Sequence, residues 1–240
     1  GLLLATSFIS AWVSNTATAA MMVPIALAVL KVVRSTREDV PIDQAEHNFG
    51  ICVLLAVAYG ASLGGVLTLI GTPPNGIFAR FVEQTYGTPV NFLDWMLIAF
   101  PIVLVMVVVT HLLMTKVLFR ELVSELPGGK EWVMHEYSKL GPMSRGEKIV
   151  LTVFVSAALL WCFGPMIRSI QIGDLMPFKP LSDTVIAMTA GIILFVIPVD
   201  NKHGIHALDW SSASETVAWD VLLLFGGGLS MAAAIQKTGL

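Results

Sequence analysis

A run of small hydroxyl and amide side chains, residues 10–18 (SAWVSNTAT), lies between two apolar segments near the start of the chain. At its centre is the tripeptide Ser14-Asn15-Thr16. Ser, Asn and Thr are preferred N-cap residues, so a helix can begin here with its first backbone amides unpaired. Such a helix start attracts anions without a formal charge, and the carbonyls that end a preceding helix suit a cation. The run therefore indicates ion-binding chemistry.

The apolar segments on either side of this run, residues 1–13 and 17–30, are short. As helices they reach only about 20 Å each, less than a hydrocarbon core of about 30 Å. One interpretation is a re-entrant helical hairpin over residues 1–30 with Ser14-Asn15-Thr16 at its tip. The other is a single tilted helix over residues 2–29 whose polar patch faces another helix. The residues alone leave both interpretations open.

A second interruption, residues 71–76 (GTPPNG), follows the uncharged apolar run at residues 49–70. Its two prolines remove two backbone donors and forbid a continuous helix, while Thr72 followed by Pro73 fits an N-cap and first-turn pair. One interpretation is a broken transmembrane helix over residues 49–86, unwound where it lines a cavity. The alternative is an external turn before a surface helix, which the spacing alone slightly favours.

The composition fixes the class of protein. Hydrophobic residues make up 55% of the chain, charged residues 13%, and the mean hydropathy is +0.79. These values are typical of an all-α polytopic membrane protein. The net charge is −3, and the charges lie in blocks between apolar runs, so no basic face for nucleic acid is expected.

Further apolar runs predict helices over residues 92–119, 149–167, 181–199 and 217–235. Residues 121–148 are polar, mixed in charge and broken by Pro and Gly, which predicts a cytoplasmic linker. Its middle, residues 131–140, is predicted to form a short helix on the membrane surface.

Nothing in the sequence predicts an enzyme. The spacing Gly60-x-Ser62-x-Gly64 matches a hydrolase nucleophile elbow, but that elbow needs a strand, a turn and a helix. Here the spacing falls within an apolar helical run, where small residues instead allow neighbouring helices to approach closely.

The two interruptions, in this order and each on an apolar segment, resemble those of the divalent anion/sodium symporter family. The resemblance extends through the whole chain, to a late Gly226-Gly227-Gly228 stretch. Proteins of this family carry dicarboxylates, citrate or sulfate across the inner or plasma membrane together with sodium. The resemblance therefore implies a multi-pass, sodium-coupled transporter of a small anion, surrounded by lipid and homodimeric as a full-length protein.

The resemblance also implies an elevator fold with two inverted repeats, each giving a re-entrant hairpin and a broken helix. Residues 1–120 would be half of the moving transport domain, residues 121–148 the linker, and residues 149–240 scaffold helices. A second Ser-Asn-Thr tip does not occur in these 240 residues, and the chain begins within a hydrophobic segment. We therefore expect an internal piece of a longer protein that holds one of two half-sites.

Carried over by position, the resemblance implies roles for individual residues in that half-site. Sodium ligands would be Ser10, Ser14, Asn15 and Gly71, and substrate contacts would come from Asn15, Thr16, Thr72 and Pro73. Two alternatives remain open at this point. One is another carrier of the wider ion-transporter group, such as an arsenite or aminobenzoyl-glutamate exporter, and the other is an inert truncated product.

Overall fold

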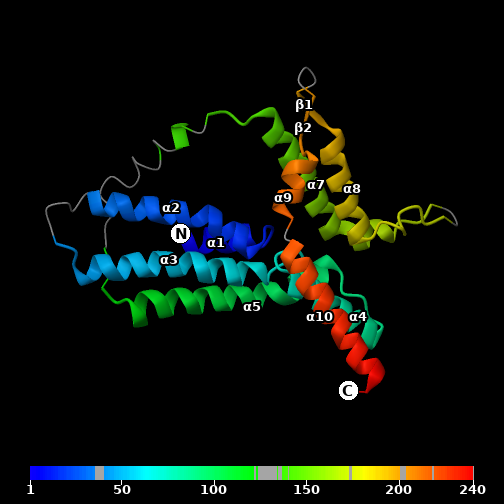
Figure 1. Cartoon of the computed structure of the whole chain (residues 1–240), viewed down its shortest axis with the longest axis horizontal. Helices are drawn as coiled ribbons and strands as arrows, with labels where there is room; N and C mark the ends of the chain where they lie inside the picture. Colours follow the sequence, from blue (N-terminus) through cyan, green and yellow to red (C-terminus); the bar gives the residue numbers. More distant parts are fainter. Residues whose placement is uncertain are drawn as a thin grey trace. The chain divides into compact units, whose positions relative to one another are not determined.

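The chain folds almost entirely into helices, as the composition predicts (Figure 1). The structure is a computed structural model that describes residues 1–35, 41–121, 123, 134, 137–139, 141–172, 175–200, 204–217 and 219–239. Within these described residues, four helices are long and apolar enough to cross a membrane, or five if a bent pair near the C-terminus counts as one. This confirms an all-α polytopic membrane chain. It divides into two compact units, Gly1–Pro142 with Leu159–Asp183, and Met143–Ala158 with Thr184–Leu240.

The first helical segment is a hairpin of two helices, α1 (Leu2–Ser10) and α2 (Asn15–Ser35). The chain leaves the helical conformation at residues 11–14, and the Ser14 hydroxyl accepts a hydrogen bond from the Ala17 amide at 3.3 Å, as an N-cap does. The single continuous helix over residues 2–29 is therefore wrong.

The second arm of the hairpin is longer than the sequence predicts. Helix α2 continues beyond residue 30 to Ser35 and includes Lys31 and Arg34 in its last turns. Cations are favourable at a helix C-terminus, and their long side chains can extend to the membrane surface. At about 1.5 Å per residue, α2 reaches about 31 Å and is long enough to cross a bilayer, whereas α1 reaches only about 14 Å.

The second interruption also separates two helices, α3 (Gln44–Gly65) and α4 (Pro73–Tyr86). Thr72 is the N-cap of α4, with φ −151° and ψ 142°, and the two prolines occupy its first turn. Gly87, in the left-handed conformation at φ 69°, ends α4. The chain leaves the helical conformation at residues 66–72, between these two helices.

The remaining helix of this unit's bundle is α5 (Phe92–Leu112), which continues as a π-helical segment, η1 (Leu113–Leu118). Helices α1, α2, α3 and α5 lie side by side with their axes roughly aligned (Figure 1). Buried Leu3 of α1 packs against Val103 and Val107 of α5. On the other side, Met22 and Ala26 of α2 pack against Val57 of α3. Helix α3 contacts α1, α2 and α5. It is therefore the central element of the bundle.

The closest approach in this bundle is between the backbones of α1 and α3. Gly60 and Gly64 lie one turn apart on α3, and a Cβ at Gly60 would lie 2.9 Å from Leu3 O. A Cβ at Gly64 would overlap the carbonyl of Ser7. The Gly60-x-Ser62-x-Gly64 spacing, which resembles a hydrolase nucleophile elbow in sequence, is thus a small-residue packing motif that lets α1 lie close against α3.

The second unit contains the first part of α7 (Arg145–Arg168), α8 (Asp183–Val196) after its first residue, and α10 (Trp219–Thr238). Residues 200–216 lie between the helices that the apolar runs predict over 181–199 and 217–235. Between α8 and α10 the structure has a two-stranded antiparallel sheet, β1 (Pro198–Asp200) and β2 (Ile205–His206), and a short helix, α9 (Trp210–Thr216). Pro198 cannot continue a helix, which is why α8 ends before the predicted residue 199.

The predicted surface helix over residues 131–140 falls mostly outside the described residues. Within it, Met134 and residues 137–139 are helical.

The α1–α3 contact can be tested by adding one methyl group. Gly64→Ala would place Cβ into the Ser7 carbonyl, so α1 must move away from α3, and we expect a lower melting temperature in detergent. Overpacking of this kind costs roughly 1–3 kcal/mol. Gly50→Ala is the matched control in the same helix, because its Cβ would lie 4.0 Å from the nearest atom, Leu30 Cδ1. Equal melting temperatures for the two variants would contradict the contact.

Candidate functional site

The two helix breaks lie against each other, and Ser10 makes the first link between the hairpin and α3. Its side chain is fully buried, and Oγ lies 2.9 Å from Asn15 Oδ1 and 2.7 Å from the carbonyl oxygen of Ala61. A hydroxyl carries one hydrogen, so Ser10 donates to one of these oxygens at a time. Three oxygen atoms therefore converge where α1 ends and α2 begins.

Thr68 makes the second link, directly from one break to the other. This side chain is fully buried within the second break. Its hydroxyl donates to the carbonyl of Ala11, in the first break, at 2.5 Å, and accepts from the amide of Gly71 at 3.1 Å. One hydroxyl thus uses both its donor and an acceptor position to connect the hairpin to the residues preceding α4.

Asn75, in the first turn of α4, holds the second break in shape. Its side chain is only 7% exposed, and Nδ2 donates to Gly65 O at 2.8 Å and to Thr68 O at 2.7 Å. Both partners are carbonyl oxygens, so the amide nitrogen must face them. Asn75 therefore satisfies the carbonyl of Gly65, at the end of α3, and adds a second donor to the carbonyl of Thr68, which also accepts from the Gly71 amide at 3.3 Å.

Gly65, the last residue of α3, is the point at which the two breaks meet. A Cβ there would overlap Asn15 Oδ1, and a Cβ at Gly71 would lie 2.5 Å from Gly65 O. The start of α2 and the segment leading into α4 therefore both rest on the same glycine, where a larger side chain has no room.

The structure brings some of the predicted site residues together and leaves others apart. Ser10 and Asn15 are hydrogen bonded to each other, and Asn15 and Gly71 both contact Gly65. Thr72 is half-buried at the start of α4. The remaining predicted residues are exposed on the chain: Ser14, Thr16 and Pro73.

Sequence reasoning missed Thr68 and Asn75 as site residues. Thr68 is the one hydroxyl in the apolar run at residues 66–70, and Asn75 is the amide within the GTPPNG interruption. A polar side chain inside an apolar run was the available signal, because such groups need internal partners.

The polar groups that meet at the breaks are uncharged. Among the residues that the structure describes, no group of three or more His, Cys, Asp and Glu side chains could hold a metal ion. Hydroxyl, amide and carbonyl oxygens instead suit a hard cation. Helices α1 and α3 present their partially negative C-terminal ends here, and α2 and α4 their partially positive N-terminal ends. The arrangement therefore combines oxygen atoms of the kind that suit a cation with helix starts of the kind that suit an anion.

Comparison with known proteins agrees with this chemistry. A family model described as the sodium:sulfate symporter transmembrane region matches residues 1–240. The chain belongs to this family. The match confirms the resemblance to divalent anion/sodium symporters, so the chain is part of an integral, multi-pass membrane protein from a family of transporters, not of enzymes.

The relatives of this chain include the sodium-dependent dicarboxylate transporter SdcS of Staphylococcus aureus. The chain is 38% identical over 242 residues to SdcS of strain bovine RF122 / ET3-1, covering 100% of this chain and 45% of the relative. For strain USA300 the identity is 37% with the same coverage. The chain thus spans a little under half the length of these relatives.

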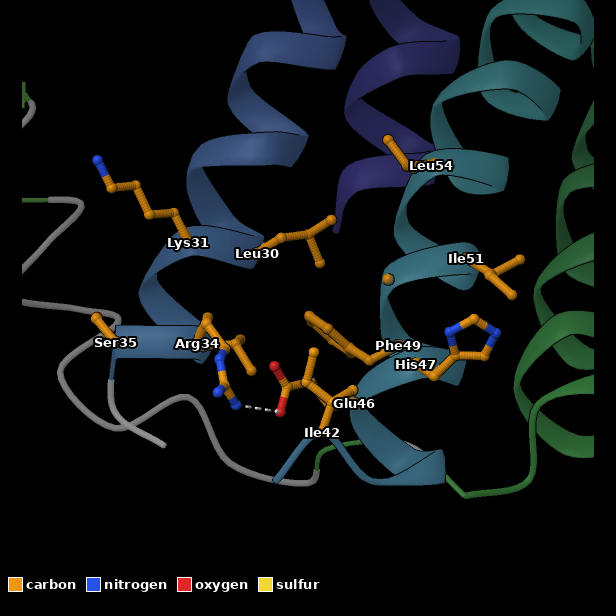
Figure 2. A pocket seen from close by; sticks show the side chains of 12 residues that line it. Leu30, Lys31, Arg34, Ser35, Ile42, Glu46, His47, Phe49, Ile51 and Leu54 are labelled. Carbon is orange, nitrogen blue, oxygen red and sulfur yellow. Dashed lines mark ion pairs between the residues drawn. The ribbon is translucent and has the colours of Figure 1, made fainter. Parts of the chain in front are cut away.

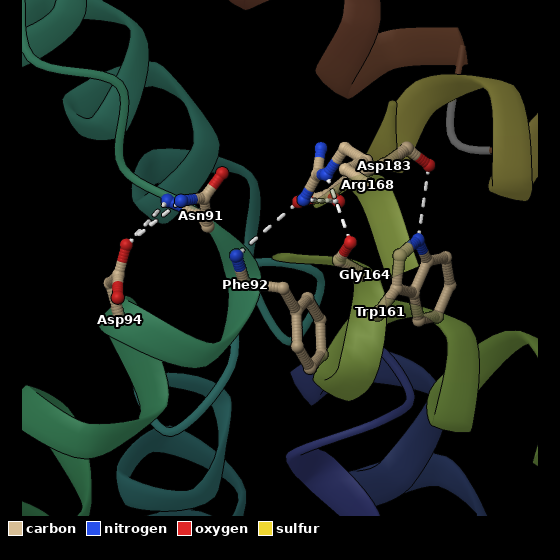
Figure 3. A network of polar contacts seen from close by, with 7 residues as sticks. All are labelled: Asn91, Phe92, Asp94, Trp161, Gly164, Arg168 and Asp183. Carbon is tan, nitrogen blue, oxygen red and sulfur yellow. Dashed lines mark hydrogen bonds and ion pairs between the residues drawn. The ribbon is translucent and has the colours of Figure 1, made fainter. Parts of the chain in front are cut away.

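Aromatic side chains support the first break. Phe92, at the start of α5, is stacked between Trp12 of the break and Trp161 of α7, with ring centroids 6.2 Å and 5.3 Å apart. Phe92 is 1% exposed. Its amide donates to the Asp183 carboxylate at 3.3 Å, and Arg168 pairs with the other carboxylate oxygen at 3.5 Å (Figure 3). These contacts, all within one compact unit, fix Trp12 against the bundle.

A cavity of about 690 Å³ lies at the opposite ends of α2 and α3, far along both helices from the breaks. It is lined mainly by apolar side chains, and an ion pair between Arg34 and Glu46, 3.5 Å apart, lies at its edge (Figure 2). A partly exposed pair of this kind contributes little to stability. This cavity does not include any of the predicted site residues.

The role of Asn75 can be tested with an isosteric change. Asn75→Asp replaces the donor nitrogen with an oxygen that faces the carbonyls of Gly65 and Thr68. We expect a free-energy loss of about 1–3 kcal/mol or more, because buried acceptors lose their donor. Thermal unfolding of the purified protein measures this loss.

Asn48→Asp is the matched control for this change. The Asn48 amide donates to the Glu121 carbonyl at 3.3 Å at an exposed position, where water can replace it. If Asn75→Asp destabilises the protein no more than Asn48→Asp, Asn75 does not hold the break.

Proposed function

We propose that this chain is one part of a transporter that couples sodium to the movement of a divalent anion, a dicarboxylate, citrate or sulfate. The observation that carries the proposal is the pair of helix breaks joined by Ser10, Thr68 and Asn75, which gathers uncharged oxygens and two helix starts at one place. Membership of the sodium:sulfate symporter family supports it, as do relatives named for sodium-dependent dicarboxylate transport.

Sodium is proposed to bind at the first break as a co-transported ion. Its ligands would be Ser10, Ser14, Asn15 and Gly71. The Ser10 and Asn15 oxygens already lie 2.9 Å apart, and Gly71 adjoins Gly65, which Asn15 contacts. When Ser10 donates its hydrogen to Ala61 O, a lone pair of Ser10 Oγ and Asn15 Oδ1 can both coordinate a cation, since hard cations prefer oxygen.

The anion is proposed to contact the starts of α2 and α4 through Asn15, Thr16, Thr72 and Pro73. An amide carries an acceptor oxygen and a donor nitrogen, so Asn15 can face sodium with one and a carboxylate with the other. Thr72 has an extended backbone before α4, where helix-start amides and the helix dipole favour negative charge. This chain would supply one of two half-sites.

Sodium compensates the charge of the anion in this proposal. A charged group at the bilayer centre costs at least about 2.5 kcal/mol even on lenient scales, and no Lys or Arg is among the residues that join the breaks. Bound sodium would lower this cost for a dianion. Because coupling between two ligands is reciprocal, the anion should also raise the affinity for sodium.

We further propose an elevator movement in a homodimer, with residues 1–120 in the transport domain, residues 121–148 as a cytoplasmic linker and residues 149–240 as scaffold. In the present conformation, residues 159–183 pack with the unit that contains the breaks. Movement between the two parts would therefore have to change the contacts of Phe92 with Trp161 and Asp183.

Uptake into proteoliposomes tests the function directly. With the complete transporter, we expect succinate, citrate or sulfate uptake to require an inward sodium gradient. Asn15→Ala should abolish this sodium-dependent uptake, because it removes the oxygen next to Ser10 and the amide that faces the anion. Asn48→Ala changes a half-buried amide near the start of α3, at the opposite end of this helix from the break, and should leave uptake unchanged.

Normal uptake by a well-expressed Asn15→Ala transporter would remove Asn15 from the site. If the uptake of succinate, citrate and sulfate does not depend on sodium, the proposed function itself is contradicted.

A further inference from the structure

The Thr68 hydroxyl is placed to do more than stabilise the second break, because its two partners belong to different breaks. It donates to Ala11 O, one residue after Ser10, and accepts from Gly71 N, one residue before Thr72. On the proposed function, Ser10 lies on the sodium side and Thr72 on the anion side. A single oxygen atom therefore lies between the two parts of the half-site.

We propose that Thr68 is a positioning residue that couples sodium binding at the first break to anion binding at the start of α4. This inference rests on the proposed function. Thr68 would touch neither ligand. It would transmit any displacement of Ala11 to the Gly71 amide, and hence to Thr72.

The surroundings of Thr68 make such transmission direct. Its backbone carbonyl is held by the Asn75 amide at 2.7 Å, so the residue cannot shift without moving α4. Its side chain is fully buried, so water cannot take over either hydrogen bond. A hydroxyl can donate and accept at once, whereas a side chain of the same shape without oxygen can do neither.

The proposal is tested by the dependence of anion affinity on sodium in the purified complete transporter. The readout is the ratio of the Kd for succinate, or for citrate or sulfate if uptake selects one of these, in choline to that in sodium. Coupling between two ligands is typically ~5- to 150-fold. We expect Thr68→Val, which keeps the shape but removes the hydroxyl, to bring this ratio close to one.

Two variants separate positioning from general stability. Thr68→Ser restores a hydroxyl and should recover most of the ratio. Thr6→Val is the matched control, because Thr6 is also fully buried but its hydroxyl donates within α1, to Leu2 O at 2.8 Å. The Thr6→Val variant should keep the wild-type ratio of Kd in choline to Kd in sodium, even if its melting temperature falls. If Thr68→Val does not fold, Thr68→Cys, with only a weak donor and acceptor, takes its place.

The outcomes distinguish this inference from the function on which it rests. A wild-type ratio in Thr68→Val, or an equal loss in Thr6→Val, would overturn the coupling role and leave the proposed function intact. A ratio of one in the wild-type transporter would instead overturn the proposed sodium coupling, and the role of Thr68 with it.

Discussion

The contact between the backbones of α1 and α3 is the constraint on which the candidate site depends. Gly60 and Gly64 remove the side chains that would keep the helices apart, and the end of α1 consequently reaches Ala61 and Thr68. Without this approach, residues 11–14 and 66–72 would be two unrelated irregular segments. With it, they become one polar centre in an otherwise apolar bundle.

The same contact explains how irregular backbone persists in a membrane chain. Non-helical backbone inside a bilayer must find partners within the protein, since lipid offers none. Here Thr68 satisfies Ala11 O and Gly71 N, while Asn75 satisfies Gly65 O and Thr68 O. These hydrogen bonds hold the irregular segments in place within the bundle.

The second break could be predicted because its signal is local, whereas the first was one of two interpretations that the residues left open. Pro73 and Pro74 end any continuous helix, and Ser14 is a good N-cap. Thr68 and Asn75 could not be assigned, since their partners Ala11 and Gly65 come within reach only after α1 packs on α3. The extension of α2 to Ser35 was missed for a different reason. Lys31 and Arg34 resemble loop residues in sequence, yet cations are favourable at a helix end.

The central claim is that uncharged oxygens at two joined helix breaks, not charged side chains, bind the transported ions. Hydrogen–deuterium exchange of the complete transporter in sodium and in choline tests it most directly. We predict slower amide exchange in sodium within both residues 11–15 and residues 66–72, with little change along the middle of α5. If sodium leaves the amide exchange rates of both segments unchanged, the account is contradicted.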